Sequence, residues 1–260
     1  MKKNEIIALY DRDPRIEVRF PHVRREVFPN LVRHVPENKT EPGFVIYSRL
    51  SEDETEAVVR AQIEYYSGLG LTFEWKVFGH DTPANLKDRL AEHGFDVGEE
   101  ESILILDLKQ AASSLRAPVQ HTIRRVTDPA EIDVIIDLEN RVWNSDHSDL
   151  GQFLKRSLRE DSAFIRIYLA YIDDRPASAA WMYMTEGSQF ASLWGGSTLP
   201  EYRKQGLYSA LLATRLQEAE QHGVQFLTVD ASPMSRPILE KLGFVCIDFS
   251  YPCTYPADTP

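Results

Sequence analysis

Apolar and polar residues follow two different periodicities along the second half of the chain. Leu207, Leu211, Leu212 and Leu216 recur at helical spacing between residues 206 and 222, and Gly223 ends that helix. Asp128 before Pro129 is typical of a helix start and predicts a helix at 129–142. Ser148 or Asp149 is expected to cap a second helix at 148–159, and Gly243 ends a third at 236–242. Runs of strand-forming residues lie between them, at 120–126, 163–172, 177–185, 189–195, 224–229 and 245–249. This order predicts an α/β domain with a mixed sheet.

The first half follows a related but less regular pattern. Ser51 and Glu54 form a capping-box motif that opens a predicted helix up to residue 68. The other elements predicted here are strands at 25–33, 44–49, 71–78 and 102–108 and helices at 4–10 and 83–93. Residues 109–118 show little periodicity and end in a proline, which indicates a linker. We therefore predict two domains, 1–110 and 118–260.

Charge and composition narrow the function classes. The 260 residues carry 29 basic and 40 acidic side chains, a net charge of −11, so phosphate-rich nucleic acids and anionic membranes are poor partners. The most apolar stretch, 176–185, is too short to span a bilayer, and the charged start of the chain does not resemble a signal peptide. Cys246 and Cys253 do not form a disulfide framework or a zinc pattern. We expect a cytoplasmic protein with free thiols.

The stretch from Leu199 to Leu212 contains the chemically most informative motif. A strand ends there, Pro200 turns the chain, and Gly206 opens the long helix. The first amides of a helix lack internal partners and lie at the positive end of its dipole, so this loop is suited to bind an anion. Gly206 lets a phosphate approach the backbone, and Arg203 either holds the loop or donates to the phosphate. Neither a P-loop nor a Rossmann fingerprint occurs in the sequence.

These residues resemble the coenzyme A loop of the GCN5-related N-acetyltransferases (GNAT), Arg/Gln-x-x-Gly-x-Gly/Ala. Arg203 and Gly206 fit that pattern. The resemblance covers residues 119–260 and includes the Gly243-Phe244 pair that follows the last predicted helix. It implies a GNAT-like acyl-CoA N-acyltransferase fold. Residues 90–95 of the first half echo residues 239–244, so we predict two tandem units, of which the first, without a glycine loop, is a degenerate relative.

The resemblance also implies a cofactor site for acetyl-CoA. Its acetyl-pantetheine arm would lie where strand 189–199 splays from strand 224–230, and a free backbone amide there would stabilise the thioester oxyanion. The pyrophosphate would lie on the loop amides, and Ser232 takes the place of a cofactor-contacting asparagine. The cofactor residues implied are Ser197, Thr198, Leu199, Arg203, Lys204, Gln205, Gly206, Leu207, Tyr208, Ser209 and Ser232.

Two positions depart from the family pattern. Tyr208 stands where the family has a small residue, so its phenol either crowds the cofactor, lines the acceptor pocket or packs outward. Leu239 stands where many members have a tyrosine that protonates the leaving thiolate, and leucine has no proton to donate. The general acid is therefore not evident from the sequence.

The acceptor amine has to lose a proton before it attacks the thioester. Asp230, at a strand end, is the first candidate base and Glu186, at a hairpin, the second. Asp230 could instead cap a helix or lie as a solvated strand end. The loop 143–149 would wall the acceptor site. The substrate-binding candidates are Trp143, Asp146, His147, Tyr183 and Trp194. Asp146, His147 and Asp149 do not complete a metal site, so no metal is expected.

These features together predict an acetyl-CoA-dependent N-acetyltransferase that acts on a small primary amine by direct transfer. The first unit would shape or cover the acceptor site, and the protein would be a monomer or a homodimer. The alternative is an acyl-CoA sensor or scaffold without catalysis, which Leu239 and Tyr208 favour. A third option is a protein-interaction module whose loop binds no ligand. The occurrence of Arg203 and Gly206 together in the loop argues against it, because the fold alone does not require both.

Overall fold

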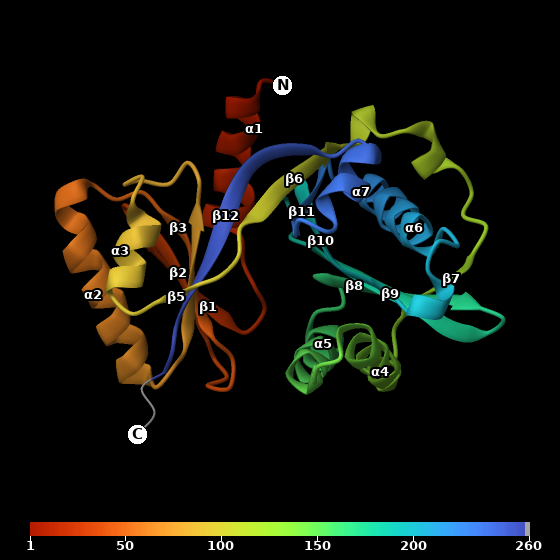
Figure 1. The fold of residues 1–260 in the computed structure, drawn as a ribbon, viewed down its shortest axis with the longest axis horizontal. Helices are drawn as coiled ribbons and strands as arrows, with labels where there is room; N and C mark the ends of the chain where they lie inside the picture. The colour runs from red at the N-terminus through yellow and green to blue at the C-terminus, as the bar shows by residue number, and fades with distance from the viewer. Residues whose placement is uncertain (258–260) are drawn as a thin grey trace. The chain divides into compact units, whose positions relative to one another are not determined.

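A computed structural model describes residues 1–257, which divide into two units. The first unit contains Met1–Leu104, Asp230–Lys241 and Val245 onward, and the second contains Ile105–Val229 and Leu242–Phe244 (Figure 1). The chain thus returns to its first unit after completing most of the second. The predicted boundaries, 1–110 and 118–260, run along the chain and do not include this return.

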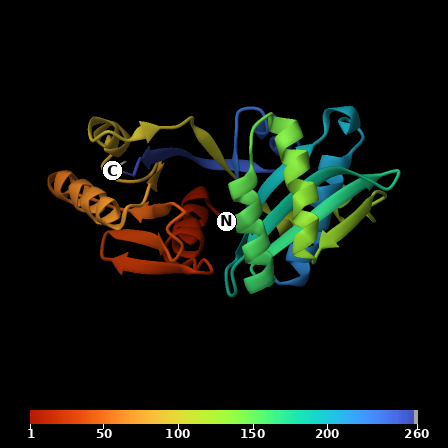
Figure 2. The same cartoon turned by 90° about the horizontal axis from the view of Figure 1, so that it is seen from below.

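The second unit is a layered α/β structure (Figure 2). Its strands lie in the order β11-β10-β9-β8-β7. In the view of Figure 2, α4 and α5 lie side by side across one face of this sheet; α6 lies on the other face (Figure 1). The elements are β7 (Thr122–Val126), η4 (Pro129–Glu131), α4 (Ile132–Trp143), α5 (Ser148–Glu160), β8 (Ile165–Ile172), β9 (Arg175–Met184), β10 (Phe190–Thr198), η5 (Pro200–Tyr202), α6 (Leu207–Gln221) and β11 (Phe226–Ala231), whose last residues enter the first unit.

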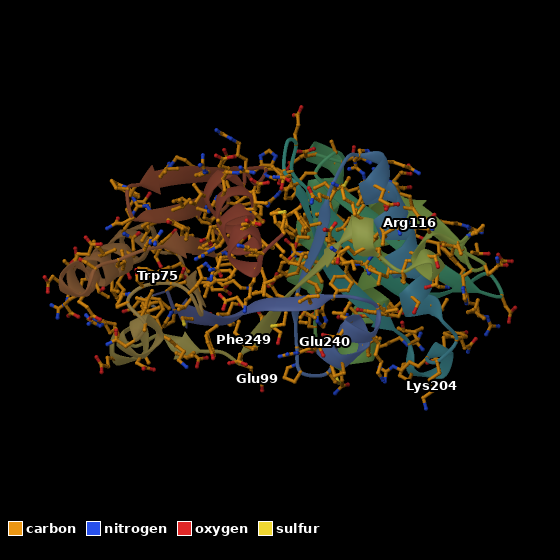
Figure 3. All side chains as sticks on the ribbon, turned by 90° about the horizontal axis from the view of Figure 1, so that it is seen from above. Trp75, Glu99, Arg116, Lys204, Glu240 and Phe249 are labelled. Carbon is orange, nitrogen blue, oxygen red and sulfur yellow. The ribbon has the colours of Figure 1, made fainter. Side chains whose placement is uncertain are left out.

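The segment predicted as a linker, 109–118, is instead packed against α6. It forms the short helices η2 (Leu108–Gln110) and η3 (Ser113–Arg116), and Leu115 is buried. Arg116, labelled in Figure 3, pairs with Glu220 of α6 at 2.7 Å. Gln217 donates to the carbonyl oxygen of Leu115 at 3.1 Å. The low periodicity of this segment predicted an irregular backbone. The segment is nevertheless not a free linker, because its contacts with α6 hold it in place.

The first unit has the strand order β1-β2-β3-β4-β12, with β5 paired to β12. The predicted strand at 25–33 is wrong, because Pro29 and Asn30 turn the chain and split it into the hairpin of β1 and β2. The elements are α1 (Lys3–Tyr10), η1 (Asp11–Glu17), β1 (Val23–Phe28), β2 (Leu31–Pro36), β3 (Gly43–Ser48), α2 (Glu52–Leu69), β4 (Phe73–Phe78), α3 (Leu86–Glu92), β5 (Asp96–Val97), β6 (Glu101–Asp107), which continues into the second unit, α7 (Arg236–Lys241) and β12 (Val245–Tyr255).

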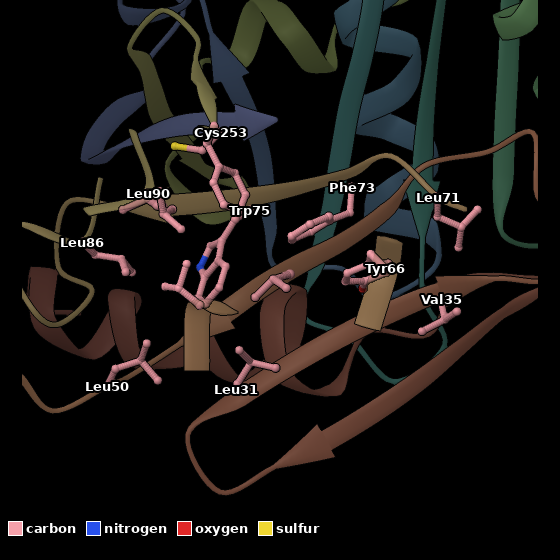
Figure 4. Packing of buried hydrophobic residues seen from close by; sticks show 14 residues of the cluster. Leu31, Val35, Leu50, Tyr66, Leu71, Phe73, Trp75, Leu86, Leu90 and Cys253 are labelled. Carbon is pink, nitrogen blue, oxygen red and sulfur yellow. The ribbon is translucent and has the colours of Figure 1, made fainter. Parts of the chain in front are cut away.

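Aromatic side chains of β4 and α2 form the core of the first unit. Trp75 and Phe73 are fully buried, and Phe73 stacks on Tyr66 with ring centroids 4.3 Å apart. Trp75 donates its indole N–H to Ser48 Oγ at 3.1 Å. Figure 4 shows Trp75 surrounded by the leucines of this cluster, with Cys253 of β12 nearby. Burial raises the pKa of Cys253 to about 12, so its free thiol stays protonated.

A polar cluster ties the N-terminal segment of the first unit to β4 and β12. Arg15 of η1 donates to both carboxylate oxygens of Asp81 at 2.7 and 2.8 Å and to Asp11 at 2.5 Å. His80, in the turn after β4, contacts Asp11 at 2.9 Å and hydrogen bonds to Asp248 of β12. Burial works to lower the pKa of His80, but the two carboxylates outweigh it and raise the pKa to about 9.

We expect His80 to stabilise the protein in a pH-dependent way. Because the pKa is raised on folding, the stabilisation is complete below about pH 6.5 and is lost as the pH rises through about 9. His80→Gln should therefore reduce the free energy of unfolding by about 2 kcal/mol at pH 6, after allowance for solvent screening, and by much less at pH 10. Urea unfolding at both pH values measures the difference, and equal losses would contradict the assignment.

Candidate functional site

The two parallel strands β10 and β11 separate within the second unit. Phe190, Ala191 and Ser192 pair with Phe226, Leu227 and Thr228, and the pairing of the two strands ends there although β10 continues to Thr198. A bulge between Gly195 and Ser197 bends β10 just beyond this point. The outer half of β10 therefore has an edge without pairing to β11, as the resemblance implied.

The loop after β10 leads into an uncapped helix. Gly206, with φ of +83°, is the N-cap of α6, no side chain caps the first turn, and no acidic residue lies in it. Lys204 also has a left-handed backbone, with φ of +62°, and its side chain lies at the surface (Figure 3). Left-handed residues alternating in such a turn direct successive backbone N–H groups into one concavity that suits an anion. The positive end of the helix dipole adds to this preference.

Several contacts fix the position of this loop. Arg203 donates from Nε to the carbonyl oxygen of Thr198 at 3.1 Å, which ties the loop to the end of β10. His121 contacts the carbonyl oxygen of Gln205 at 2.8 Å. Leu207 is fully buried, whereas Gln205 and Gly206 are exposed. Leu207 thus anchors a first turn that follows a loop open to solvent.

Tyr208 lies between the first turn of α6 and β10. A side chain at Gly196 would lie 3.0 Å from the Tyr208 ring, so the ring packs directly on this glycine. Burial raises the pKa of Tyr208, so the phenol is neutral near pH 7. Behind it, buried Arg215 donates to the carbonyl oxygens of Trp181 and Trp194 at 3.1 and 3.2 Å. The ring therefore packs inward against β10, so of the three alternatives for Tyr208 the outward-packing one does not apply.

The other cofactor candidates differ in whether their polar groups already form hydrogen bonds within the protein. The amide of Leu199 donates to Ala177 at 3.0 Å, and the carbonyl oxygen of Ser197 accepts from Ser178 at 2.7 Å. Ser232 lies in the first unit, is exposed, and accepts from the amide of Ser235 at 3.4 Å. The amide of Leu199 is therefore not a spare donor for an oxyanion.

Two of the acceptor-site candidates are brought together by β9 and β10. The rings of Tyr183 and Trp194 meet edge to face with centroids 5.9 Å apart, and Phe164 stacks on Tyr183 at 5.1 Å. Trp194 is 47% exposed. These strands thus present an aromatic surface on which one ring is open to solvent.

The loop between α4 and α5 is held by its own hydrogen bonds. Asp146 accepts from the amide and the hydroxyl of Ser148 at 3.1 and 2.6 Å. His147 contacts Asn140 Oδ1 at 3.1 Å. The bonds to Asp146 cap the start of α5 in place of the Ser148 or Asp149 side chains. Trp143, at the end of α4, reaches β10 and donates to Ser197 Oγ at 3.0 Å.

The two base candidates lie in different surroundings. Asp230 belongs to the first unit, where its carboxylate hydrogen bonds to the partly buried ammonium of Lys76. Lys76 also donates to Glu101 at 2.9 Å. Glu186 is exposed in the turn between β9 and β10. Within the described residues 1–257, no cluster of three metal-ligating side chains occurs and no helix is long and apolar enough to cross a membrane.

Leu239 is buried in α7 and packs as a core residue. Sequence reasoning missed Glu139, a buried carboxylate of α4 that accepts from Ser197 Oγ at 2.8 Å. A signal for it exists, because Glu139 falls on the apolar stripe of Ile132, Ile135 and Leu138.

A protein-family comparison decides what kind of domain carries this loop. Residues 106–231 match the family model described as "Acetyltransferase (GNAT) domain". The segment is a GNAT domain. Comparison with curated proteins finds no match.

Solved GNAT structures share the fold across both units. A GCN5-related N-acetyltransferase from Kribbella flavida aligns with a TM-score of 0.69 and 15% identity, over 98% of this chain and 94% of that one. One from Sphaerobacter thermophilus aligns with 0.62 and 10%, over 99% and 87%. A tandem GNAT protein from the clavulanic acid biosynthesis pathway aligns with 0.59 and 16%, over 88% and 79%. At these identities the likeness establishes the fold, which confirms the predicted mixed α/β GNAT architecture.

Proposed function

We propose that the GNAT domain is an acetyl-CoA-dependent N-acetyltransferase that moves the acetyl group to a small primary amine by direct transfer. The observation that carries the proposal is the uncapped start of α6 at Gly206, directly after the half of β10 that has left β11. An anion site beside an open strand edge fits a ligand with a pyrophosphate and an extended amide-containing arm. Bound acetyl-CoA would supply the thioester.

The residues present are suited to hold this cofactor. The first-turn amides from Leu207 to Ser209 would bind the pyrophosphate, with Arg203, Lys204 and Gln205 adding donors from an exposed loop. The open edge of β10 up to Thr198 would pair with the pantetheine arm. Positive φ at Gly206 leaves room for the phosphate, since no Cβ intrudes there. Ser232 remains a candidate contact that acetyl-CoA binding by a Ser232→Ala variant would test.

We also propose that the first unit binds no acetyl-CoA. Its parallel strands β3 and β4 pair over Gly43–Val45 with Phe73–Trp75 and then separate in the same manner as β10 and β11. Here, however, the helix start of α2 carries a Ser51 capping box and the acids Glu52, Asp53 and Glu54. A filled and negatively charged helix start repels a phosphate.

An arginine occupies the place where β3 and β4 diverge. Arg15 donates to the carbonyl oxygen of Ile46, the residue after the last pair, at 2.7 Å. Its guanidinium lies 3.9 Å from the ring centroid of Phe78 on β4. Asp81, the partner of Arg15, accepts from the amide of Phe78 at 3.0 Å. One side chain thus contacts both strands where a pantetheine arm would enter.

Calorimetric titration with acetyl-CoA tests both proposals. We expect one molecule bound per chain with a dissociation constant in the micromolar range, about −8 kcal/mol. Release of free CoA thiol is then measured with primary amines. Two sites per chain would contradict the proposal for the first unit, and no binding would contradict the proposal for the GNAT domain.

A sensor or scaffold that binds acyl-CoA without turnover is the second candidate function. The buried Leu239 favours it, because the position at which relatives are expected to carry a proton donor is part of the core. Binding of acetyl-CoA without thiol release across the amines would support this alternative.

A further inference from the structure

A carboxylate is buried where β10 bulges. Glu139, on α4, is 3% exposed. Its Oε2 accepts from Ser197 Oγ at 2.8 Å and from Trp143 Nε1 at 2.9 Å, and Trp143 also donates to Ser197 Oγ at 3.0 Å. Oε1 has no hydrogen-bond partner among residues 1–257. The three side chains form a closed triangle with one unused carboxylate oxygen.

This arrangement is costly for folding alone. A buried carboxylate loses its hydration, and an unpartnered buried oxygen recovers none of that loss. Apolar residues occupy the neighbouring positions of the same buried face of α4, namely Ile132, Ile135 and Leu138. A leucine at position 139 would continue that face without the penalty. Packing alone therefore does not explain a carboxyl group at this position.

The position of Glu139 relative to the proposed cofactor supports such a role. Ser197 follows the Gly195 bulge in β10, within the half of the strand that does not pair with β11. That is the strand edge proposed above to hold the acetyl-pantetheine arm. Asp230 is already engaged by Lys76, and Glu186 is exposed in a turn. Glu139 therefore has better contacts to β10 than either candidate that the sequence suggested.

We propose that Glu139 accepts the proton of the acceptor ammonium through the hydroxyl of Ser197. The inference rests on the proposed acetyltransferase function and deepens it. The ammonium N–H passes its proton to Ser197 Oγ while the Ser197 proton moves to Glu139, which becomes neutral. The freed amine attacks the thioester carbon, and the C–S bond breaks. The proton still on the attacking nitrogen passes to the departing thiolate, and Glu139 later returns its own proton to solvent.

The electrostatics of the cluster agree with a proton acceptor. Burial raises the pKa of Glu139, and the hydrogen bonds from Ser197 and Trp143 offset this only in part. His147, in the loop before α5, faces Glu139 from outside α4, and a positive charge on its ring would favour the ionised carboxylate. Ser197, from β10, contributes a neutral hydroxyl. A carboxylate of raised basicity matches proton transfer near neutral pH better than an ordinary one.

The test compares Glu139→Gln and Ser197→Ala with Asp137→Asn as the control. The amide introduced by Glu139→Gln keeps an oxygen for both donors and removes the charge, whereas exposed Asp137 undergoes the same kind of change two residues away on α4. Acetyl-CoA binding, thermal unfolding and thiol release are measured with n-propylamine, tyramine, glucosamine, L-lysine and spermidine over the pH range from about 4 to about 9.5, which begins near the ordinary pKa of a glutamate carboxyl.

We expect Glu139→Gln to lower kcat/KM by about 100-fold or more and to remove the acidic limb of its pH profile. Ser197→Ala should cost a similar factor and the double variant little more, because the two groups act as one unit. Asp137→Asn should stay within about twofold, and acetyl-CoA binding should be unchanged in Glu139→Gln and Asp137→Asn. A Glu139→Gln enzyme that retains the rate or the acidic limb overturns the inference.

The remaining outcomes separate this inference from the proposed function. If the wild-type protein binds acetyl-CoA but acetylates none of the five amines, the proton-transfer role of Glu139 is overturned. The acyl-CoA sensor or scaffold is then the function that remains. A wild-type protein that does not bind acetyl-CoA overturns the proposed function itself. Loss of thermal stability in Glu139→Gln without a change in the pH profile would assign Glu139 a structural role.

Discussion

Replacement of Gly206 by glutamate is expected to weaken acetyl-CoA binding by more than about 100-fold, about 3 kcal/mol. Gly206 has φ of +83° at the start of α6, so any side chain there strains the backbone that shapes the loop. A glutamate adds a negative charge where the pyrophosphate would lie and competes for the same amides. Calorimetric titration of the purified variant with acetyl-CoA measures the loss.

Gly223→Glu is the matched control for this experiment. Gly223 follows the other end of α6, has φ of +76°, and an added Cβ would meet no atom within 4 Å. The substitution thus introduces the same side chain and a similar backbone strain away from the loop. It should bind acetyl-CoA like the wild type. A folded Gly206→Glu protein with normal affinity would refute the loop assignment.

Replacement of Arg15 by alanine is expected to reduce the free energy of unfolding by about 3–5 kcal/mol, because it leaves the buried carboxylate of Asp81 without its partner. Arg15 and Asp81 are each 2% exposed at their side chains. The variant also loses the hydrogen bond to Ile46 and the stacking on Phe78. Urea unfolding near neutral pH measures the change.

Arg12→Ala controls for the loss of a guanidinium in the same segment. The Arg12 side chain is 50% exposed and pairs with neighbouring Asp13, so its replacement should leave stability close to that of the wild type. Equal destabilisation by both substitutions would show that the segment, and not the buried Arg15–Asp81 pair, determines the loss.

The elements that local rules govern could be predicted from the sequence. The capping box of Ser51 and Glu54 opens α2 as expected, because both of its hydrogen bonds form between residues three apart. Gly206 begins α6 for the same local reason, since only its conformation admits the turn. The parallel β10–β11 pair followed from the order of strands and helices. Such features depend on neighbours along the chain.

The features that the sequence did not reveal depend on distant partners. Arg15 meets Asp81 across 66 positions, and Asp230 meets Lys76 across 154. No local pattern identifies such pairs, so the sequence could not show that the Asp230 carboxylate is paired with Lys76. Glu139 could have been found from its place on the apolar stripe of α4, but its contact with Ser197 depends on how α4 packs on the sheet.

The pairing of β12 with β4 has a consequence for the order in which the protein is made. Ser250 to Tyr255 pair with Phe78 to Phe73, so β4 obtains this neighbour only from residues near position 250. Because a ribosome adds about 5–20 residues per second, β4 leaves the exit tunnel many seconds before β12 exists. During that interval an apolar strand has an unpaired edge, which is a site for aggregation and chaperone binding. The first unit is begun first during synthesis but is completed last.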